Sequence, residues 1–135
     1  MVDVKYFFKE NRKSSEKIQF SPSDSFEDET GKAVECVLRK ISAERNAEIV
    51  EDCTTIKKGE PKVDNDRYTR LLVAECVVEP NLNDVDLQNN YGVKSAEDLV
   101  QKIWKDAGEW LRLVNKINSF NGFKNLDDES EELGN

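Results

Sequence analysis

Histidine is absent from the 135 residues of this chain, and cysteine is scarce. Without imidazole there is no His-based general acid or base, no Ser-His or Cys-His nucleophile pair and no His metal ligand. Cys36, Cys53 and Cys76 are odd in number and lack a C-x-x-C pair, which excludes the usual disulfide and zinc patterns. The six scattered glycines form no phosphate-binding loop. We therefore expect no enzymatic activity and no cofactor.

Long apolar runs and clusters of basic residues are also missing. The longest apolar run, 71–78, is interrupted by Glu75 and is far shorter than the ~20 residues that span a bilayer. The first residues do not resemble a signal peptide, so a cytosolic location is expected. The net charge of −8 and the scattered Lys and Arg residues disfavour nucleic acid and anionic membranes as partners.

What the chain does contain is enough apolar sequence for one modest core. A domain of this length buries roughly two-thirds of the surface that its unfolded chain exposes, so it needs no metal or disulfide to fold. The patterning changes from period 2 to period 3.6 near Ser42. We therefore predict an α+β fold, in which an N-terminal β-hairpin or small antiparallel sheet packs on a mostly helical C-terminal half of four to five helices.

The N-terminal half is predicted to hold short elements. Residues 1–16 are expected to be a flexible segment, with an aromatic helix that Asp3 caps. A strand is plausible at 17–20, and 26–41 is predicted to be a hairpin that turns at Gly31. Ser42 is a good N-cap for a helix that runs to about Cys53, and 54–66 is predicted to be a loop.

The C-terminal half is predicted to be helical. One helix should run from Asp64 or Asp66 to Glu79, and a strand at 71–78 is the competing interpretation. A short helix is expected at 84–90, and Ser95 with Asp98 resembles a capping box for the next helix. The last helix should begin near Asp106 and end at Asn121-Gly122, with Trp110, Leu111, Val114 and Ile117 on one face.

One domain, 17–125, is therefore expected, followed by a disordered acidic tail at 126–135. Its predicted buried residues are Leu72, Cys76, Leu99, Ile103, Val114 and Ile117. Cys36 and Cys76, which lie in apolar runs, are expected to be small core residues. The paired carboxylates, such as Asp84 with Asp86, are better explained as helix caps or solvated surface than as an acid–base pair.

Trp104 and Trp110 lie on the apolar faces of adjacent predicted helices. Such residues are more often core or helix-pair contacts than part of a ligand cage. Aromatic residues are also enriched at the centres of interfaces, so one of the two is a candidate for partner binding. The same choice applies to the aromatic residues 6–8, which could dock on their own domain or on another chain.

Several short segments together resemble a known family. They are LQNNYGV at 87–93, AEDL at 96–99, GEW at 108–110 and INSFNGF at 117–123, in that order. Upstream, LLVAECVVEP at 71–80 is followed by NLND at 81–84. The series is similar to the XkdN-like tail assembly chaperones of phages and prophages of Gram-positive bacteria, and it covers roughly 17–123.

The resemblance implies a function that composition alone does not show. Proteins of this family are thought to coat the tape measure protein before the tail tube polymerises around it, and then to leave. The implied partner is the tape measure protein, with the tail tube protein and self-association as further possibilities. The implied location is the bacterial host cytoplasm, with absence from the mature virion. The candidate partner-binding residues are Tyr91, Trp104, Trp110, Phe120 and Phe123.

Two alternatives stay open at this point. An acidic inhibitor that mimics DNA would need its carboxylates in a duplex-like stripe, whereas here they are dispersed along the chain. A minor structural tail protein would remain in the virion, where mass spectrometry of purified particles would detect it.

Overall fold

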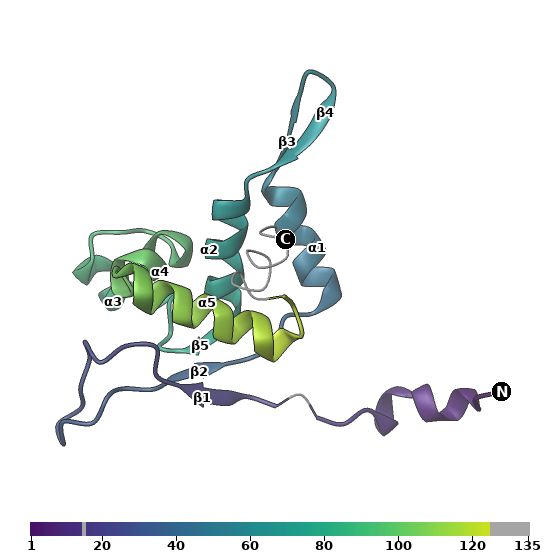
Figure 1. The fold of residues 1–135 in the computed structure, drawn as a ribbon, viewed down its shortest axis with the longest axis horizontal. Coiled ribbons are helices and arrows are strands. Elements are labelled where there is room, and N and C mark those ends of the chain that lie inside the picture. Colours follow the sequence, from purple (N-terminus) through teal and green to yellow (C-terminus); the bar gives the residue numbers. More distant parts are fainter. Residues whose placement is uncertain (15, 125–135) are drawn as a thin grey trace, which may run out of the picture.

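The computed structural model of the chain describes residues 1–14 and 16–124, and it confirms the α+β class. In these residues two small antiparallel sheets combine with five α-helices, which lie mostly in the C-terminal half (Figure 1). The elements are η1 (Val4–Phe7), η2 (Lys9–Asn11), β1 (Ile18–Phe20), β2 (Cys36–Leu38), α1 (Ala43–Asp52), β3 (Thr54–Lys57), β4 (Glu60–Val63), α2 (Asn65–Cys76), β5 (Val77–Glu79), α3 (Val85–Asn90), α4 (Ala96–Ile103) and α5 (Ala107–Asn121).

The larger sheet has the strand order β1-β2-β5, all antiparallel, with Gln19 opposite Val37 and Val37 opposite Glu79. Cys36 and Leu38 of the central strand are buried, while Val37 between them is half-buried. The alternation follows from the strand period of two, which directs every second side chain into the core. The sheet and α5 lie side by side in the lower part of Figure 1.

The hairpin predicted over 26–41 is only partly correct. Gly31 does form the turn, with φ +82°, and a single bridge joins Glu27 to Ala33. The returning strand, however, pairs with β1 and β5 instead. The reason is burial: Cys36 and Leu38 gain a core there, whereas the polar stretch at 27–32 offers them none.

The loop predicted at 54–66 is wrong, because the structure forms a hairpin of β3 and β4 there. Lys58 and Gly59 have φ values of 52° and 79°, and two consecutive positive φ angles are typical of a type I′ turn. All of β4 is exposed, so no apolar alternation marked the strand in the sequence. The hairpin projects beyond the ends of α1 and α2 (Figure 1).

The predicted helix to Glu79 also needs correction. α2 ends at Cys76 and the chain continues as β5, so the helical and the extended interpretations each hold for part of this run. Val77 and Val78 are β-branched, Pro80 disfavours helix in the residue before it, and β2 offers a partner for a third strand. The Glu79–Pro80 peptide bond is cis.

α2 is the centre of the helical half, in contact with α1, α4 and α5. All six residues predicted to be buried are at most 8% exposed. All three cysteines are buried and free, which confirms Cys36 and Cys76 as core residues.

Leu111, expected on the inner face of α5, is 37% exposed, and Leu113 is buried instead. The helix therefore lies rotated from the predicted face, with Leu113, Val114 and Ile117 inward.

Several helix starts follow the predicted capping chemistry. Ser42, Asp64, Asp84 and Ser95 each accept a hydrogen bond from the backbone N–H three residues later. Asp106 precedes α5 without such a side-chain bond.

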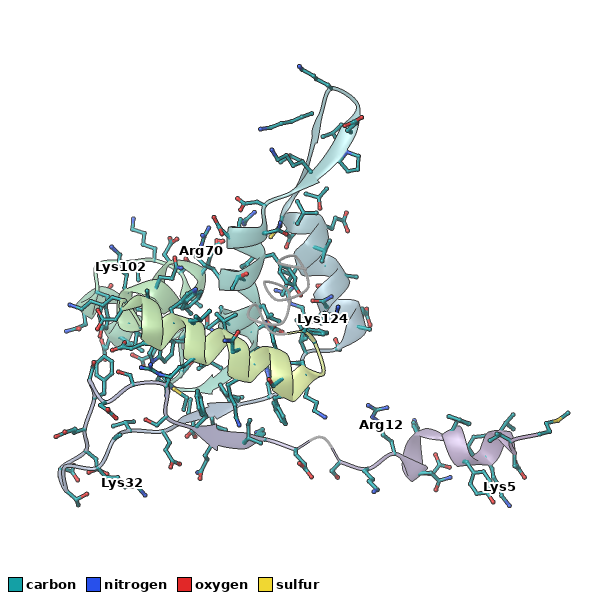
Figure 2. All side chains as sticks on the ribbon, viewed as in Figure 1. Lys5, Arg12, Lys32, Arg70, Lys102 and Lys124 are labelled. Carbon is teal, nitrogen blue, oxygen red and sulfur yellow. The ribbon has the colours of Figure 1, made fainter. Side chains whose placement is uncertain are left out.

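Residues 1–14 lie apart from the domain, and every one of them is exposed (Figure 2). They form two short 3₁₀ helices, where the sequence predicted one helix. The predicted cap is present, since the Lys5 N–H donates to Asp3 Oδ1 at 2.9 Å. The predicted tail, 126–135, lies outside the described residues.

Candidate partner-binding groove

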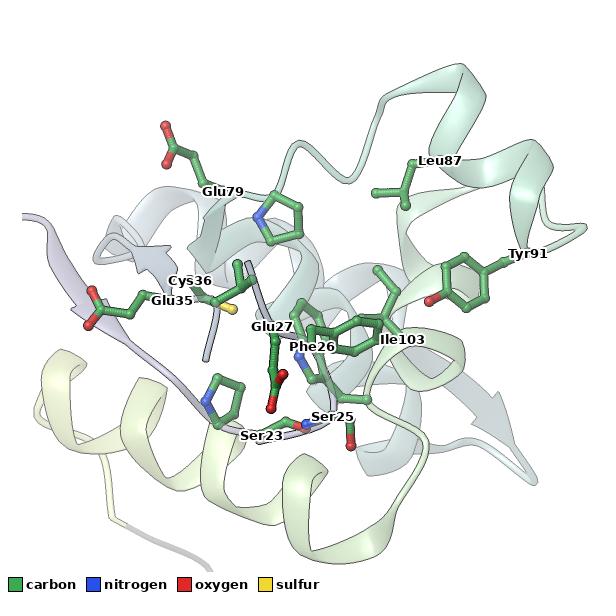
Figure 3. A pocket seen from close by; sticks show the side chains of 14 residues that line it. Ser23, Ser25, Phe26, Glu27, Glu35, Cys36, Glu79, Leu87, Tyr91 and Ile103 are labelled. Atoms are coloured by element: carbon green, nitrogen blue, oxygen red, sulfur yellow. The ribbon is translucent and has the colours of Figure 1, made fainter. Parts of the chain in front are cut away.

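An apolar groove of about 610 Å³ opens between the loop at 21–35, the end of β5, and the helices α3 and α4 (Figure 3). Ile103 and Trp104, at the end of α4, are 8% and 3% exposed and belong to the buried part of its lining, together with Cys36 and Ser23. Leu87 and Tyr91 line it from α3, and both are half-buried. A volume of this size falls in the range of pockets that hold a ligand or several side chains of a partner.

The side of the groove formed by the loop carries exposed apolar residues. Phe26 and Val34 are 40% and 47% exposed, and both line the groove. They flank the turn at Gly31, so the turn brings two apolar side chains from nine residues of sequence to one opening. Apolar surface exposed beside a concave site is typical of protein–protein contact.

Helix ends position Tyr91 and Trp104, two of the aromatic residues that line the groove. Tyr91 is the C-cap of α3, and Gly92 follows with φ +70°. Trp104 is the C-cap of α4, and its N–H donates to Val100 O at 3.1 Å. At each position the chain leaves the helix, so both aromatic residues lie at a helix end and line the groove from there.

The loop is attached to α5 by several polar contacts. The Ser25 hydroxyl donates to Glu109 Oε1 at 2.6 Å, and Arg112 Nε donates to Pro22 O at 2.9 Å. The hydrogen bonds from Ser25 and then Ser23 lower the pKa of Glu109 below its ordinary value, and the nearby Arg112 charge adds to the effect. These contacts fix one wall of the groove to the last helix.

The charged residues that line the groove are all acidic. They are Glu27, Glu35 and Glu79, and none of the lining residues is Lys or Arg. In Figure 3, Glu35 and Glu79 lie on one side of the cavity, and Leu87 and Tyr91 lie on the other. The groove therefore combines an apolar centre with a negative margin, which suits an apolar polypeptide that carries basic residues.

Of the five candidate residues from the sequence, the structure brings two together, since Tyr91 and Trp104 both line the groove. Trp110 and Phe120 are half-buried against the core, and Lys40 Nζ lies 5.2 Å from the centre of the Phe120 ring. Phe123 is 39% exposed and borders a second hollow of about 430 Å³ between α2 and α5.

The sequence analysis missed Phe26, Val34 and Leu87 as groove residues. Leu87 lies within the predicted short helix and within the LQNNYGV segment, and its place beside Tyr91 in that segment could have identified it as a groove residue. No comparable pattern identified Phe26 and Val34, because the prediction of a hairpin does not indicate which part of the domain its turn packs against.

The groove contains one potentially nucleophilic thiol, that of Cys36. Burial raises the pKa of this thiol to about 11, so the thiolate is scarce at neutral pH. Burial likewise raises the pKa of Cys76 to about 11. Within the described ranges, 1–14 and 16–124, no group of His, Cys, Asp or Glu could hold a metal ion. In the same ranges no helix is long and apolar enough to cross a bilayer.

The fold and the groove define a class: a small acidic α+β protein with an apolar groove on its surface. The model of the phage XkdN-like tail assembly chaperone family matches residues 4–133, nearly the whole sequence. The chain belongs to this family, as the ordered segments from 71 onward had indicated.

Two relatives in Bacillus subtilis (strain 168) resemble the chain over almost all of its length. One is the phage-like element PBSX protein XkdN, 27% identical over 141 aligned positions that cover 100% of this chain and 95% of that protein. The other is the uncharacterized protein YqbN, 27% identical over 138 positions that cover 98% of this chain and 91% of that protein. The crystal structure of YqbN superposes with a TM-score of 0.81 at 22% identity, covers 92% of this chain and 99% of that one, and shows the same fold.

Proposed function

We propose that this tail assembly chaperone binds the tape measure protein of its phage or prophage and has no catalytic activity. The observation that carries the proposal is the apolar groove with Tyr91 and Trp104 in its lining, in a chain that belongs to this family. Binding takes place in the host cytoplasm, before the tail tube forms around the tape measure, and the chaperone leaves before the virion is complete.

The groove suits a helical client of the kind that the family resemblance implies. An amphipathic helix places apolar side chains at i, i+3, i+4 and i+7, and a hydrophobic groove accepts that row. The lining offers Tyr91 and Leu87 as accessible apolar contacts over the buried Trp104. Phe26 and Val34 extend the contact onto the loop at 21–35.

Release matters as much as capture for an assembly chaperone. A modest affinity per site, repeated along a long client, gives firm coating while many copies are bound and allows each copy to leave. A small groove with a half-exposed margin fits this requirement better than a fully enclosed site. Trp110, Phe120 and Phe123 are proposed as additional contacts, and the tail tube protein as a second partner at the moment of displacement.

The test is co-expression with the tape measure protein of the same phage, followed by pull-down and measurement of Kd. Leu87→Ala with Tyr91→Ala should weaken binding about tenfold or more, because it removes the accessible apolar centre of the groove. Leu111→Ala is the matched control: Leu111 is 37% exposed on α5, outside the groove, and its loss should leave Kd unchanged. Trp110→Ala, Phe120→Ala and Phe123→Ala then test the additional contacts one at a time.

Salt separates this mechanism from mimicry of DNA. With an apolar centre and charges only at the margin, raising salt from about 0.05 to about 0.5 M should change Kd less than about threefold. A steep loss of binding with salt would favour an acidic DNA mimic. Absence of any complex at either salt concentration would refute the tape measure as the client, and the protein in purified virions would indicate a structural tail protein.

A further inference from the structure

The N-terminal segment, defined here as residues 1–14, exposes an unusual amount of apolar surface. Val4, Tyr6, Phe7 and Phe8 are 72%, 67%, 80% and 51% exposed, within five consecutive positions. Burial of apolar side chains is favourable, so four of them together favour contact with a partner surface. Contiguous exposed apolar residues of this kind mark an interaction site.

The segment is already organised for docking. Two 3₁₀ turns arrange the aromatic side chains, Asp3 caps the first turn, and Asn11 Nδ2 donates to Lys5 O at 2.6 Å across both turns. A segment with such internal hydrogen bonds loses less conformational entropy on binding than an unstructured one.

The charge of the segment is opposite to that of the rest of the chain. Residues 1–14 carry four basic and two acidic side chains, a net of +2, in a protein whose formal net charge is −8. Lys5 and Arg12 lie beside the two turns (Figure 2), and Lys5 Nζ is 3.8 Å from Asp3 Oδ2 and 5.6 Å from the centre of the Tyr6 ring. The segment therefore combines an aromatic centre with basic flanks.

The groove of the domain has the complementary properties. Its centre is apolar, and Glu27, Glu35 and Glu79 are the charged residues among those that line it. Its volume of about 610 Å³ is sufficient for two or three large side chains. Within the described residues, the exposed aromatic cluster and this acidic apolar groove match in both polarity and charge.

We propose that the N-terminal segment of one copy docks in the groove of a second copy. Figure 1 shows the segment beyond one end of the sheet, while α3 and α4, which line the groove, lie at the other end. The chain enters β1 from the segment and reaches the groove wall directly after it, at Pro22. Residues 1–14 extend away from the groove of their own copy, so a neighbouring copy is the occupant that needs no rearrangement of the segment.

A contact between two different surfaces of identical chains is heterologous. When the rotation between copies does not close a ring, such contacts produce an open chain of molecules. The free chaperone would then associate head to tail. The proposed self-association does not depend on whether the tape measure protein binds the same groove. The experiment that tests it uses the chaperone alone.

The experiment uses two variants, each with one of the two surfaces disabled. Phe7→Ala with Phe8→Ala disables the segment, and Val34→Arg disables the groove by placing a long cation where basic flanks must approach. All three residues are exposed, so both variants should fold, which circular dichroism checks. Ile56→Arg is the control for Val34→Arg, because Ile56 is 69% exposed on β3, away from the groove.

Sedimentation velocity should show concentration-dependent association of the unmodified chain and of Ile56→Arg. Each disabled variant alone should be monomeric, with association at least about tenfold weaker. A mixture of the two variants should form a 1:1 heterodimer and nothing larger, because one intact segment meets one intact groove. The peptide of residues 1–14 should bind the variant with the disabled segment and not Val34→Arg.

Three results would overturn the proposal. One is a monomeric unmodified chain at every concentration together with no binding of the peptide. Another is a monomeric chain in which the peptide does bind, because that shows docking within one copy. The third is association that persists when Phe7 and Phe8 are replaced, because the copies then meet through another surface.

Discussion

Glu109 is a carboxylate that the fold almost removes from solvent, at 6% exposure. It is tolerated there because Ser25 donates a 2.6 Å hydrogen bond to it and Ser23 donates another. Its position in the first turn of α5 also suits a negative charge. One side chain thus connects the helical half to the loop that forms a wall of the groove.

Glu109→Gln should therefore destabilise the domain in a pH-dependent way. The pKa of Glu109 is lower in the folded state than in the unfolded one, so its stabilisation is fully present above the unfolded value of about 4.3. It is lost as pH falls through the folded-state pKa. At pH 7 the variant should lose about 1 kcal/mol of unfolding free energy, and the difference should vanish in acid. Urea unfolding at pH 7 and at a series of lower pH values measures how the difference declines.

Glu48→Gln is the control for this change. Glu48 pairs with Arg45 at 2.8 Å on an exposed helix face, where such pairs contribute little. Equal losses in both variants, or a loss at Glu109 that does not depend on pH, would contradict the assigned role of the carboxylate.

At the scale of single elements, the groove depends on where α3 and α4 begin and end. Both helices are short, at six and eight residues, and short helices have little intrinsic stability. Their caps therefore matter more than they would in a long helix. Asp84 Oδ1 accepts from the Leu87 N–H at 2.9 Å, and Ser95 Oγ accepts from the Asp98 N–H at 3.1 Å.

Ser95→Ala should lower the free energy of unfolding by about 1 kcal/mol, because the Asp98 N–H loses its partner at the start of α4. Gln101→Ala, at an exposed position inside the same helix, should change it by less than about 0.5 kcal/mol. Thermal or urea unfolding of both variants makes the comparison. Equal effects would mean that the serine does not act as a cap.

At the scale of the whole molecule, the N-terminal segment and the β3–β4 hairpin project from the packed domain (Figure 1). Neither contributes a residue to the main hydrophobic cluster. Stability therefore resides in the three-stranded sheet and the helices packed around α2. The projecting parts are free to serve contacts with other chains.

Deletion of residues 2–14 should accordingly leave the melting temperature within about 2 °C, when it is measured on dilute protein. The physical reason is that none of these residues is buried in the domain. Differential scanning fluorimetry at low concentration makes the measurement. A fall of several degrees would show that the segment packs on its own domain.

Some features were determined by local sequence. The absence of histidine and of metal-binding patterns excluded whole classes of chemistry, and the caps at Ser42, Asp84 and Ser95 were identified from side chains that act within one turn. Helical periodicity identified Leu99, Ile103 and Ile117 as core. The ordered segments from 71 to 123 indicated the family. Each of these signals operates over a few residues, or accumulates along the chain, so it can be recognised without knowing what lies alongside.

Other features depended on contacts between distant parts of the chain. Residues 77–79 form β5 instead of continuing the helix because one edge of β2 was available for pairing. The other edge of β2 pairs with β1, and not with the segment on the other side of the Gly31 turn. The β3–β4 hairpin has no alternation of apolar and polar residues in the sequence, because neither of its faces is buried. The groove joins residues from 22 to 104, and Glu109 acts through Ser25, which is 84 positions away in sequence. Such choices follow from which surfaces are available for burial and pairing, and only the tertiary structure supplies that information.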